Sequence, residues 1–261
     1  MATTLTRPTL NETAKPGRRA LADWTASRLF EMIFNGELEP GSPLGEIEIT
    51  ELLGVSRSPI RDALRQLEES GLIEVVPSSG RRVVRRFDVN DIYELYTIRV
   101  ALESLSVRHA AERITASEIR HLESLLTAMG KAKTTARIPA GRDFEADFRF
   151  HEAVCQASGL DRLHRILSGL WLQTRALLRH LDAAGIYPTG DELDHVVDDH
   201  AQVLAALRAH DAAAAEAAIS DHLRLRRDHL VEAVRAGGGI GPNAAIESGD
   251  AHLSKVGSTS R

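Results

Sequence analysis

The sequence predicts a mainly α-helical protein: an N-terminal winged helix-turn-helix followed by an all-α helical bundle. Two observations carry this prediction. Residues 20–86 contain three stretches with apolar residues at helical spacing, and then two short β-branched runs around the turn sequence PSSG. Residues 87–236 keep helical periodicity throughout and show no alternating pattern typical of strands.

The first predicted helix covers residues 20–34, where apolar side chains recur at helical spacing (Leu21, Trp24, Leu29 and Ile33). Residues 35–45 contain three glycines and two prolines, which indicates a turn-rich connection to the next helix.

The sequence of residues 46–70 predicts the two helices of the helix-turn-helix and the turn between them. A helix over 46–53 ends at Gly54, and a second helix follows Ser56, which we expect to cap it, and ends at Gly71. Pro59 falls in the first turn of that helix, where its missing N–H costs little. The second helix buries one apolar stripe, so its opposite, solvent-facing side carries arginines spaced four apart: Arg57, Arg61 and Arg65.

The second part, residues 87–236, predicts six helices near 88–112, 115–131, 141–157, 160–183, 189–209 and 211–235. Four residues are candidate N-caps for these helices: Asp88, Thr115, Asp161 and Asp211. Outside the two parts, we expect residues 1–19 to form a flexible basic arm and the Gly/Ser-rich residues 237–261 a disordered tail.

Composition narrows the class of protein. No window approaches 18 uncharged apolar residues and no apolar segment follows the N-terminus, which argues against a membrane span or a secretory signal. Cys155 is the only cysteine, so no intramolecular disulfide can form and a cytoplasmic location is expected. The net charge of −5 argues against non-specific coating of nucleic acid, although residues 57–86 form a local basic island.

The arginines that we expect to be exposed in this basic island indicate a DNA-binding surface. The planar guanidinium matches O6 and N7 of guanine in the major groove and also binds phosphates. Ser56 and Ser58 can donate to a phosphate at the helix N-terminus, where backbone N–H groups are free. Gly80 at the hairpin tip allows close approach to the minor groove, with Arg81 and Arg82 beside it. A solvated basic surface is the alternative that charge alone leaves open.

Residues 35–83 resemble the N-terminal domain of the GntR family of bacterial transcription regulators. The resemblance rests on the G-x-L-x-P-G turn, the G-V-S-R-x-P-[IV]-R-x-A-L segment and L-x-x-x-G-L before the wing. The helical remainder resembles the FCD ligand-binding domain of the FadR subfamily. The resemblance implies a homodimer on a pseudo-palindromic double-stranded operator, with one recognition helix in each half-site.

The same resemblance assigns roles within the DNA-binding part. It implies that Arg57 and Arg61 meet bases or nearby phosphates, that Arg65 is peripheral, and that Gly80 is the wing tip. This sequence has Ile47 where some family members have a DNA-contacting arginine. Operator sequences are therefore not transferable from those members, and the basic arm is a candidate for an additional phosphate contact.

Four polar residues fall on the apolar stripes of three predicted helices. Asp147 and His151 are four residues apart and share one helical face, and His200 and His222 lie inward on two later helices. Neutral imidazoles with a carboxylate inside a bundle can bind a divalent metal. Histidines satisfied by ordinary hydrogen bonds are the alternative, and helical geometry leaves the two readings about equal.

The FCD resemblance favours the metal and implies Asp147, His151, His200 and His222 as its ligands, with Zn²⁺ or Ni²⁺ as the ion. It also implies a small carboxylate effector at this site. Arg99 falls at the family's recurrent arginine and is a candidate effector contact, and Arg175 is a weaker candidate of the same kind. The alternative is that Arg99 does not contact an effector and is a surface or salt-bridge arginine, since Glu94 and Glu103 are near in sequence.

The function expected from these features is ligand-controlled repression of transcription, without enzymatic activity. A metal-dependent enzyme acting on a small organic acid is one alternative. Its signal is weak because HEAVC lacks the second histidine of H-E-x-x-H and Cys155 has no matching base. An architectural DNA-binding protein without effector is the other alternative. It is disfavoured because a purely structural core would gain by replacing the four polar residues.

Overall fold

A computed structural model describes residues 18–134, 143–186 and 191–236. The expected arm, apart from its last two residues, and the expected tail lie outside this range. The helices within it are α1 (Arg18–Phe34), α2 (Glu46–Leu53), α3 (Arg57–Glu69), α4 (Val89–Arg113), α5 (Ala116–Thr134), α6 (Asp143–Ala157), α7 (Asp161–Ala183), α8 (Asp191–Arg208) and α9 (Ala212–Ala236). Two strands, β1 (Ile73–Val75) and β2 (Arg82–Val84), complete the elements, and the predicted mainly α fold is confirmed.

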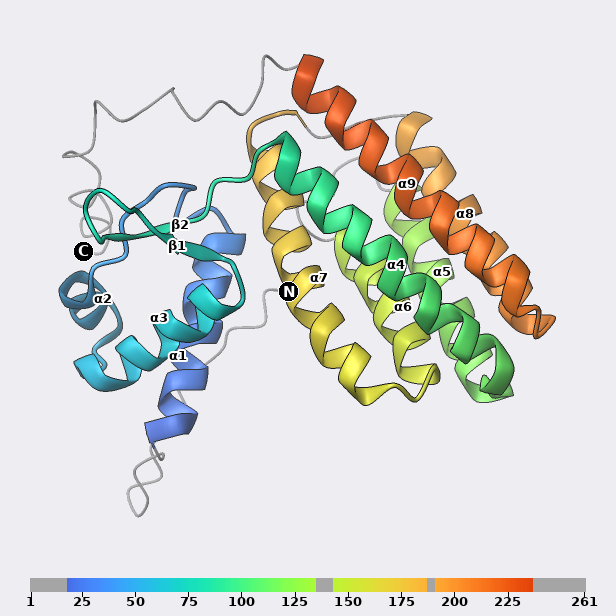
Figure 1. The fold of residues 1–261 in the computed structure, drawn as a ribbon, viewed down its shortest axis with the longest axis horizontal. Coiled ribbons are helices and arrows are strands. Elements are labelled where there is room, and N and C mark those ends of the chain that lie inside the picture. The colour runs from blue at the N-terminus through green and yellow to red at the C-terminus, as the bar shows by residue number, and fades with distance from the viewer. Residues whose placement is uncertain (1–17, 135–142, 187–190, 237–261) are drawn as a thin grey trace.

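The smaller lobe contains α1, α2, α3 and the hairpin (Figure 1). Strands β1 and β2 pair antiparallel, with Ile73 opposite Val84 and Val75 opposite Arg82. Helix α3 packs on α1, and its apolar side is fully buried at Ile60 and Leu64. This is the winged helix-turn-helix that the alternation of patterns predicts.

Three residues account for the turn between α2 and α3. Gly54 ends α2 in the left-handed region at φ 63°, where a residue without Cβ is unstrained. Val55 is buried behind the turn, and Pro59 lies in the first turn of α3. The chain therefore reverses within three residues and presents the N-terminus of α3 outward.

The larger lobe is a bundle of α4 to α9, in which α4 runs along α9 and α6 lies between α5 and α7 (Figure 1). Its core includes Tyr96, Phe150 and Leu177, and the buried residues of both lobes form one continuous cluster. None of the helices in the described ranges is both long and apolar enough to span a membrane.

Three of the four predicted caps bond to their helices. Asp88 accepts from the Asp91 backbone N–H while Asp91 bonds back to Asp88, and Thr115 and Glu118 make the same reciprocal pair. Asp211 accepts from the backbone N–H groups of residues 213 and 214. The prediction for Asp161 is wrong, because α7 already begins at this residue and the cap position belongs to Leu160.

The two lobes meet through α1 and α7. Arg179 of α7 donates from Nε to the carbonyl oxygen of Phe34 at 2.8 Å, at the last residue of α1. Arg85, just after β2, pairs with Asp91 in the first turn of α4 at 2.5 Å. These contacts attach the smaller lobe to the bundle at the end of α1 and just after β2.

Candidate functional site

Helix α3 presents a polar face opposite its buried side. The side chains at its N-terminus and along this face are exposed, as predicted: Ser56, Arg57, Ser58, Arg61 and Arg65. Ser56 occupies the cap position, but its hydroxyl makes no hydrogen bond to the helix, contrary to the expected cap. The hydroxyl and the first-turn N–H groups are therefore open to an incoming acceptor such as a phosphate.

Two of the three arginines of this face already have carboxylate partners. Arg61 donates from Nε and Nη2 to the two carboxylate oxygens of Glu46, each at 3.2 Å. Arg65 lies 3.7 Å from Glu69, one helical turn away. The predicted line of arginines is thus exposed, but Arg61 is held by the first residue of α2, a contact that joins the two helices.

Ile47, next to Glu46, is 54% exposed. The position at which some family members have an arginine therefore faces solvent here with an apolar side chain. It can make van der Waals contact with a thymine methyl group or a sugar, but it cannot neutralise a phosphate.

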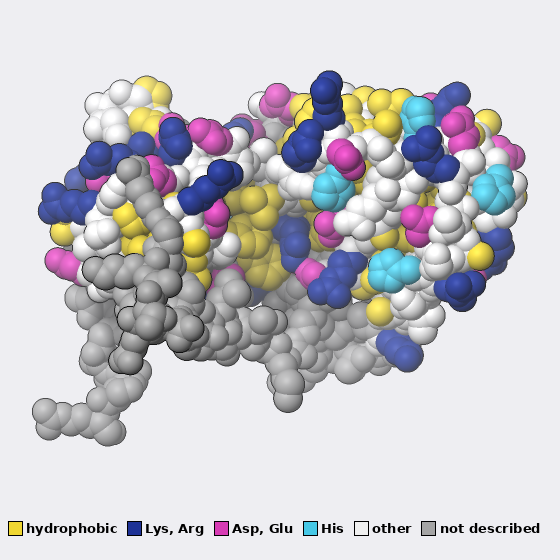
Figure 2. All heavy atoms as spheres, turned by 90° about the horizontal axis from the view of Figure 1, so that it is seen from below, with side chains coloured by type: hydrophobic (Ala, Val, Ile, Leu, Met, Phe, Trp, Pro, Cys, Tyr) yellow, Lys and Arg dark blue, Asp and Glu magenta, His cyan; other side chains and the backbone are white. Residues whose placement is uncertain are grey.

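The wing carries fewer free charges than expected. Gly80 at the tip has φ 66° and open space around its Cα, so its conformation rather than lack of room favours glycine. Arg81 is exposed, whereas Arg82 is half-buried and pairs with Glu68 of α3 at 3.2 Å. Figure 2 shows basic side chains on the outer part of this lobe, at the left, while the histidines visible on that face lie over the larger lobe.

The second site lies inside the bundle. Asp147 and His151 come from α6, His200 from α8 and His222 from α9, and one ligand atom of each lies within 4.8 Å of the others. The three histidines are buried, and the Asp147 side chain is 22% exposed. Asp147 Oδ1 is 3.2 Å from His200 Nε2 and 3.9 Å from His151 Nε2. The structure thus brings together all four residues singled out in the sequence.

Each imidazole has an acceptor beside its Nδ1 atom. His200 Nδ1 is 2.6 Å from the carbonyl oxygen of Val196, and His222 Nδ1 is 3.3 Å from Asp199 Oδ2. His151 Nδ1 is 2.6 Å from Glu103 Oε2, a contact that is electrostatic rather than a well-aligned hydrogen bond. Acceptors at Nδ1 favour the proton there and leave the Nε2 lone pairs for a metal ion.

Asp147 sets the charge of the cluster. Burial alone would raise the pKa of its carboxyl, but the hydrogen bond with His200 and the nearby histidine charges lower it well below its usual range. Burial would lower the pKa of His200, yet the hydrogen bond and charge of Asp147 outweigh burial and raise it. Burial and the charge of His200 lower the pKa of His222 to about 4. Asp147 is thus ionised, which is the form that binds a cation, and a bound cation would displace the proton that His200 Nε2 shares with Asp147.

The donor set fits a divalent cation. The Nε2 atoms of His151 and His200 face each other at 3.4 Å, where two lone pairs repel unless a proton or a cation lies between them. Ligands of one zinc ion, each about 2.0–2.2 Å from the metal, are separated by comparable distances. The acceptors beside the three Nδ1 atoms complete the arrangement that is usual around metal-binding histidines.

The two predicted effector contacts are both engaged within the chain. Arg99 is 2% exposed, donates from Nε to Glu103 Oε1 at 2.7 Å and lies over the Tyr96 ring. Arg175 pairs with Glu145 and lies between the rings of Phe34 and Phe148, at 5.7 and 5.4 Å from their centroids. Neither lines the pocket beside the cluster, and their contact with an effector stays a prediction.

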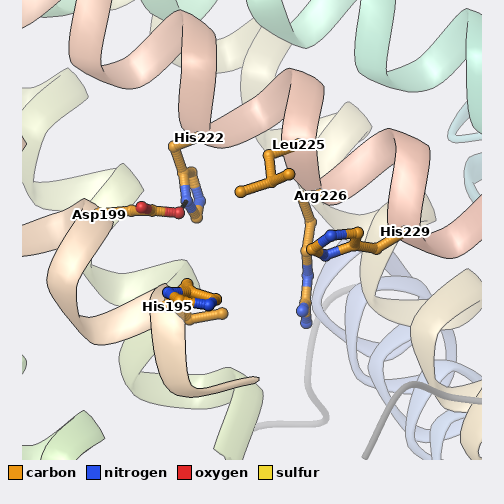
Figure 3. A pocket seen from close by; sticks show the side chains of 7 residues that line it. His195, Asp199, His222, Leu225, Arg226 and His229 are labelled. Atoms are coloured by element: carbon orange, nitrogen blue, oxygen red, sulfur yellow. Dashed lines mark hydrogen bonds and ion pairs between the residues drawn. The ribbon is translucent and has the colours of Figure 1, made fainter. Parts of the chain in front are cut away.

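A small pocket opens beside the cluster, between α8 and α9 (Figure 3). Asp199 points to His222, and His195, Arg226 and His229 line the remaining sides. His222, a residue of the candidate metal centre, therefore lines one side of the pocket. Side chains that can donate hydrogen bonds line three further sides.

Two functional residues escaped the sequence analysis. Glu103 had been considered only as a partner of Arg99, but it also accepts from Trp171 Nε1 at 2.9 Å and lies beside His151. Asp199 was not singled out in the sequence, and it lies beside His222, with its Oδ2 3.3 Å from His222 Nδ1. The spacing of Arg99 and Glu103 was the only available signal, and nothing in the spacing connects either acid to a histidine.

Models of two known families match separate parts of the chain. The model of bacterial regulatory proteins of the gntR family matches residues 21–83, and the FCD domain model matches residues 94–225.

Curated relatives extend over most of the chain. LutR of Bacillus subtilis, an HTH-type transcriptional regulator, is 28% identical over 76% of this chain and 96% of its own length. A probable D-xylose utilization operon transcriptional repressor of Paenarthrobacter nicotinovorans is 30% identical over 83% of this chain and 89% of its own. The transcriptional repressor RspR of Escherichia coli is 29% identical over 72% of this chain and 78% of its own.

The fold also matches a solved structure. McbR/YncC of E. coli superposes with a TM-score of 0.67 at 25% identity, over 81% of this chain and 97% of that chain. The gntR family and these relatives are transcription regulators rather than enzymes, in agreement with the expected function. The chain is a transcription regulator that belongs to the GntR family and combines a GntR DNA-binding domain with an FCD domain.

Proposed function

We propose that this protein is a repressor whose operator binding is controlled by a small carboxylate effector at a divalent-metal site in the FCD domain. The observation that carries the proposal is the buried convergence of Asp147 with three histidines whose Nδ1 atoms all have acceptors. Two relatives of this chain bear the name of repressor, which supports the direction of control.

The DNA-binding part of the proposal concerns α3 and the wing. A homodimer would insert one α3 into the major groove of each half of a pseudo-palindromic operator, and it would act in the cytoplasm. Arg57 and Arg61 would reach bases, Arg65 would be peripheral, and Ser56, Ser58, Gly80 and Arg81 would approach phosphates. Their exposure on one lobe supports this assignment.

The metal part concerns the four buried ligands. Asp147, His151, His200 and His222 would hold Zn²⁺ or Ni²⁺, ions that accept imidazole and carboxylate ligands. A bound ion supplies positive charge and coordination positions for a carboxylate. The pocket beside His222, with donors on Arg226 and His229, is a suitable place for the rest of a small acid. Arg99 or Arg175 could bind the effector only by exchanging Glu103 or Glu145 for it.

The response would travel from α6 to the DNA-binding lobe. Glu145 lies two residues before the ligand Asp147 and pairs with Arg175, which contacts Phe34 at the end of α1. A shift of α6 on effector binding would thus displace a group packed on the DNA-binding lobe. This contiguous route gives the two sites a physical means of biasing one another.

An architectural DNA-binding protein remains the competing function. It has no use for a carboxylate and three imidazoles in an apolar bundle, because well-packed apolar residues would be at least as stable there.

The test uses the full chain purified without a histidine tag. We expect about one Zn²⁺ or Ni²⁺ per chain by elemental analysis, a lower melting temperature after chelation, and recovery when the metal is returned. His200→Ala should lose the metal and the response of operator binding to small carboxylates, while its affinity for the operator changes little. A metal-free protein indifferent to chelator would favour the architectural function, and an unchanged effector response in His200→Ala would exclude this metal site.

A further inference from the structure

Glu103 is a buried carboxylate whose two oxygens have different partners. Its Oε1 accepts from Arg99 Nε at 2.7 Å and from Trp171 Nε1 at 2.9 Å. Its Oε2 lies 2.6 Å from His151 Nδ1. Arginine keeps its charge at any ordinary pH, so Glu103 is the buried counter-ion of Arg99 and stays ionised. The counter-ion contact uses Oε1 alone and leaves Oε2 facing the histidine.

The acceptor beside His151 differs from those beside the other two histidine ligands. His200 faces a backbone carbonyl oxygen of its own helix, and His222 faces Asp199, whose side chain is 21% exposed. Glu103 is buried and comes from α4, a helix that packs on α6 and supplies none of the four candidate ligands. One ligand therefore has a charged acceptor that belongs to a helix outside the candidate metal centre.

The position of one proton decides whether His151 can bind a metal ion. A neutral imidazole carries its proton on one nitrogen, and the other nitrogen has the lone pair that binds a metal. An ionised carboxylate can only accept, so Glu103 favours the proton on His151 Nδ1. This nitrogen is buried and has no well-aligned hydrogen bond within the described part of the chain, so Oε2 is the acceptor in reach of its proton. Nε2 is then left for the metal.

We propose that Glu103 is a positioning residue for the metal site, which holds His151 in the tautomer whose Nε2 lone pair faces the metal ion. The inference rests on the metal site of the proposed function. If Glu103 were only the counter-ion of Arg99, the proton of His151 would be free to lie on either nitrogen.

Glu103→Gln reverses the tautomer without changing the size of the side chain. Arg99 and Trp171 both donate to Oε1, so the amide oxygen must take that position. The amide NH₂ then replaces Oε2 and donates to His151 Nδ1, which moves the ring proton to Nε2. We expect a loss of about 10–100-fold in Zn²⁺ affinity, measured in the full chain by competition with a chelator.

Asp199→Asn is the matched control, because it removes the same charge beside another ligand, His222. The Asp199 side chain is partly exposed and its contact with His222 is longer, at 3.3 Å, so an amide there can turn its oxygen towards Nδ1. Its Zn²⁺ affinity should fall a few-fold at most, as the loss of charge alone requires. Trp171→Phe controls for stability, since it removes one donor to Glu103 Oε1 and leaves Oε2 beside His151. It should keep the wild-type affinity.

The tautomer itself is measured from ¹⁵N chemical shifts of the histidine rings in the metal-free full chain, at a pH where the rings are neutral. The loss of signals in His151→Gln assigns the ring. We expect Nδ1–H in wild type and Nε2–H in Glu103→Gln. Nε2–H in wild type would overturn the inference even if Glu103→Gln did not fold, and so would equal losses of affinity in Glu103→Gln and Asp199→Asn. A wild-type chain that binds neither Zn²⁺ nor Ni²⁺ would overturn the proposed metal site itself.

Discussion

Arg61 and Arg99 each bind a glutamate, yet the two pairs belong to opposite kinds of environment. The Arg99 and Glu103 side chains are 3% and 4% exposed, inside the bundle, and their contact is 2.7 Å. Arg61 is mostly exposed and its contacts with Glu46 are 3.2 Å. In the bundle neither partner can exchange the other for water, so the pair is a fixed part of the architecture. On the DNA-binding lobe solvent reaches the Arg61 side chain, so this pair can open at little cost.

The difference shows how one interaction serves two purposes. A buried charge without its partner is costly, because the charge loses its hydration on burial and no opposite charge replaces that hydration. An exposed pair costs little to break, because water solvates both charges and salt screens their attraction. The metal-site region should therefore respond to substitution through stability, and the DNA-binding region through recognition.

The largest effect is expected at Glu103. Glu103→Leu leaves Arg99 charged and buried, and it removes the acceptor of Trp171 Nε1 and the carboxylate beside His151. We expect the free energy of unfolding to fall by about 3–5 kcal/mol, measured by urea denaturation of the metal-free protein. A loss below about 1 kcal/mol would show that this pair behaves like a surface pair.

The next effect concerns recognition without stability. Arg57→Ala should weaken operator binding by about 1–3 kcal/mol and relax the base preference at one position, because it removes a major-groove donor. Fluorescence anisotropy with operator and substituted duplexes measures both quantities. The urea midpoint should stay at the wild-type value, and operator binding as tight and selective as that of wild type would contradict the assignment of α3.

A third substitution examines how the regions communicate. Arg175→Met keeps much of the apolar contact with Phe34 and Phe148 but removes the ion pair with Glu145. We expect metal binding and operator binding to persist separately, while their coupling falls by about 1 kcal/mol. The measurement is operator affinity with and without metal and a responsive carboxylate.

Arg149→Met is the matched control for this coupling, since Arg149 binds the same Glu145 at 2.7 Å but stays on α6 and is 63% exposed. It should leave the coupling unchanged. Equal losses in the two variants would mean that the charge of Glu145, rather than the contact with α1, carries the signal.

The smallest effect is expected at Glu216, which pairs with Arg108 at 2.7 Å on the surface of the bundle, with side chains 39% and 52% exposed. Glu216→Leu should change the free energy of unfolding by less than about 1 kcal/mol in the same urea experiment. A loss as large as that at Glu103 would remove the distinction between buried and exposed pairs.

The sequence by itself determined the helices, the hairpin and the four clustered side chains. Apolar spacing reports which face of a helix is buried, so it located His200 and His222, and the spacing of Asp147 and His151 placed both on one face. The motif around Arg57 and Arg61 identified the DNA-binding lobe. All of these signals are local, because each one is contained within a single segment of the chain.

Only the tertiary structure decided which side chains of different helices pair with one another. Glu46 with Arg61, Glu103 with His151, Asp199 with His222 and Arg175 with Glu145 all join different helices. Helical periodicity predicts that a residue points inward or outward, but it carries no information on which helix lies opposite. That depends on the crossing and register of packed helices, so the partners of Asp199 and Arg61 could be identified only once the neighbouring helices were in place.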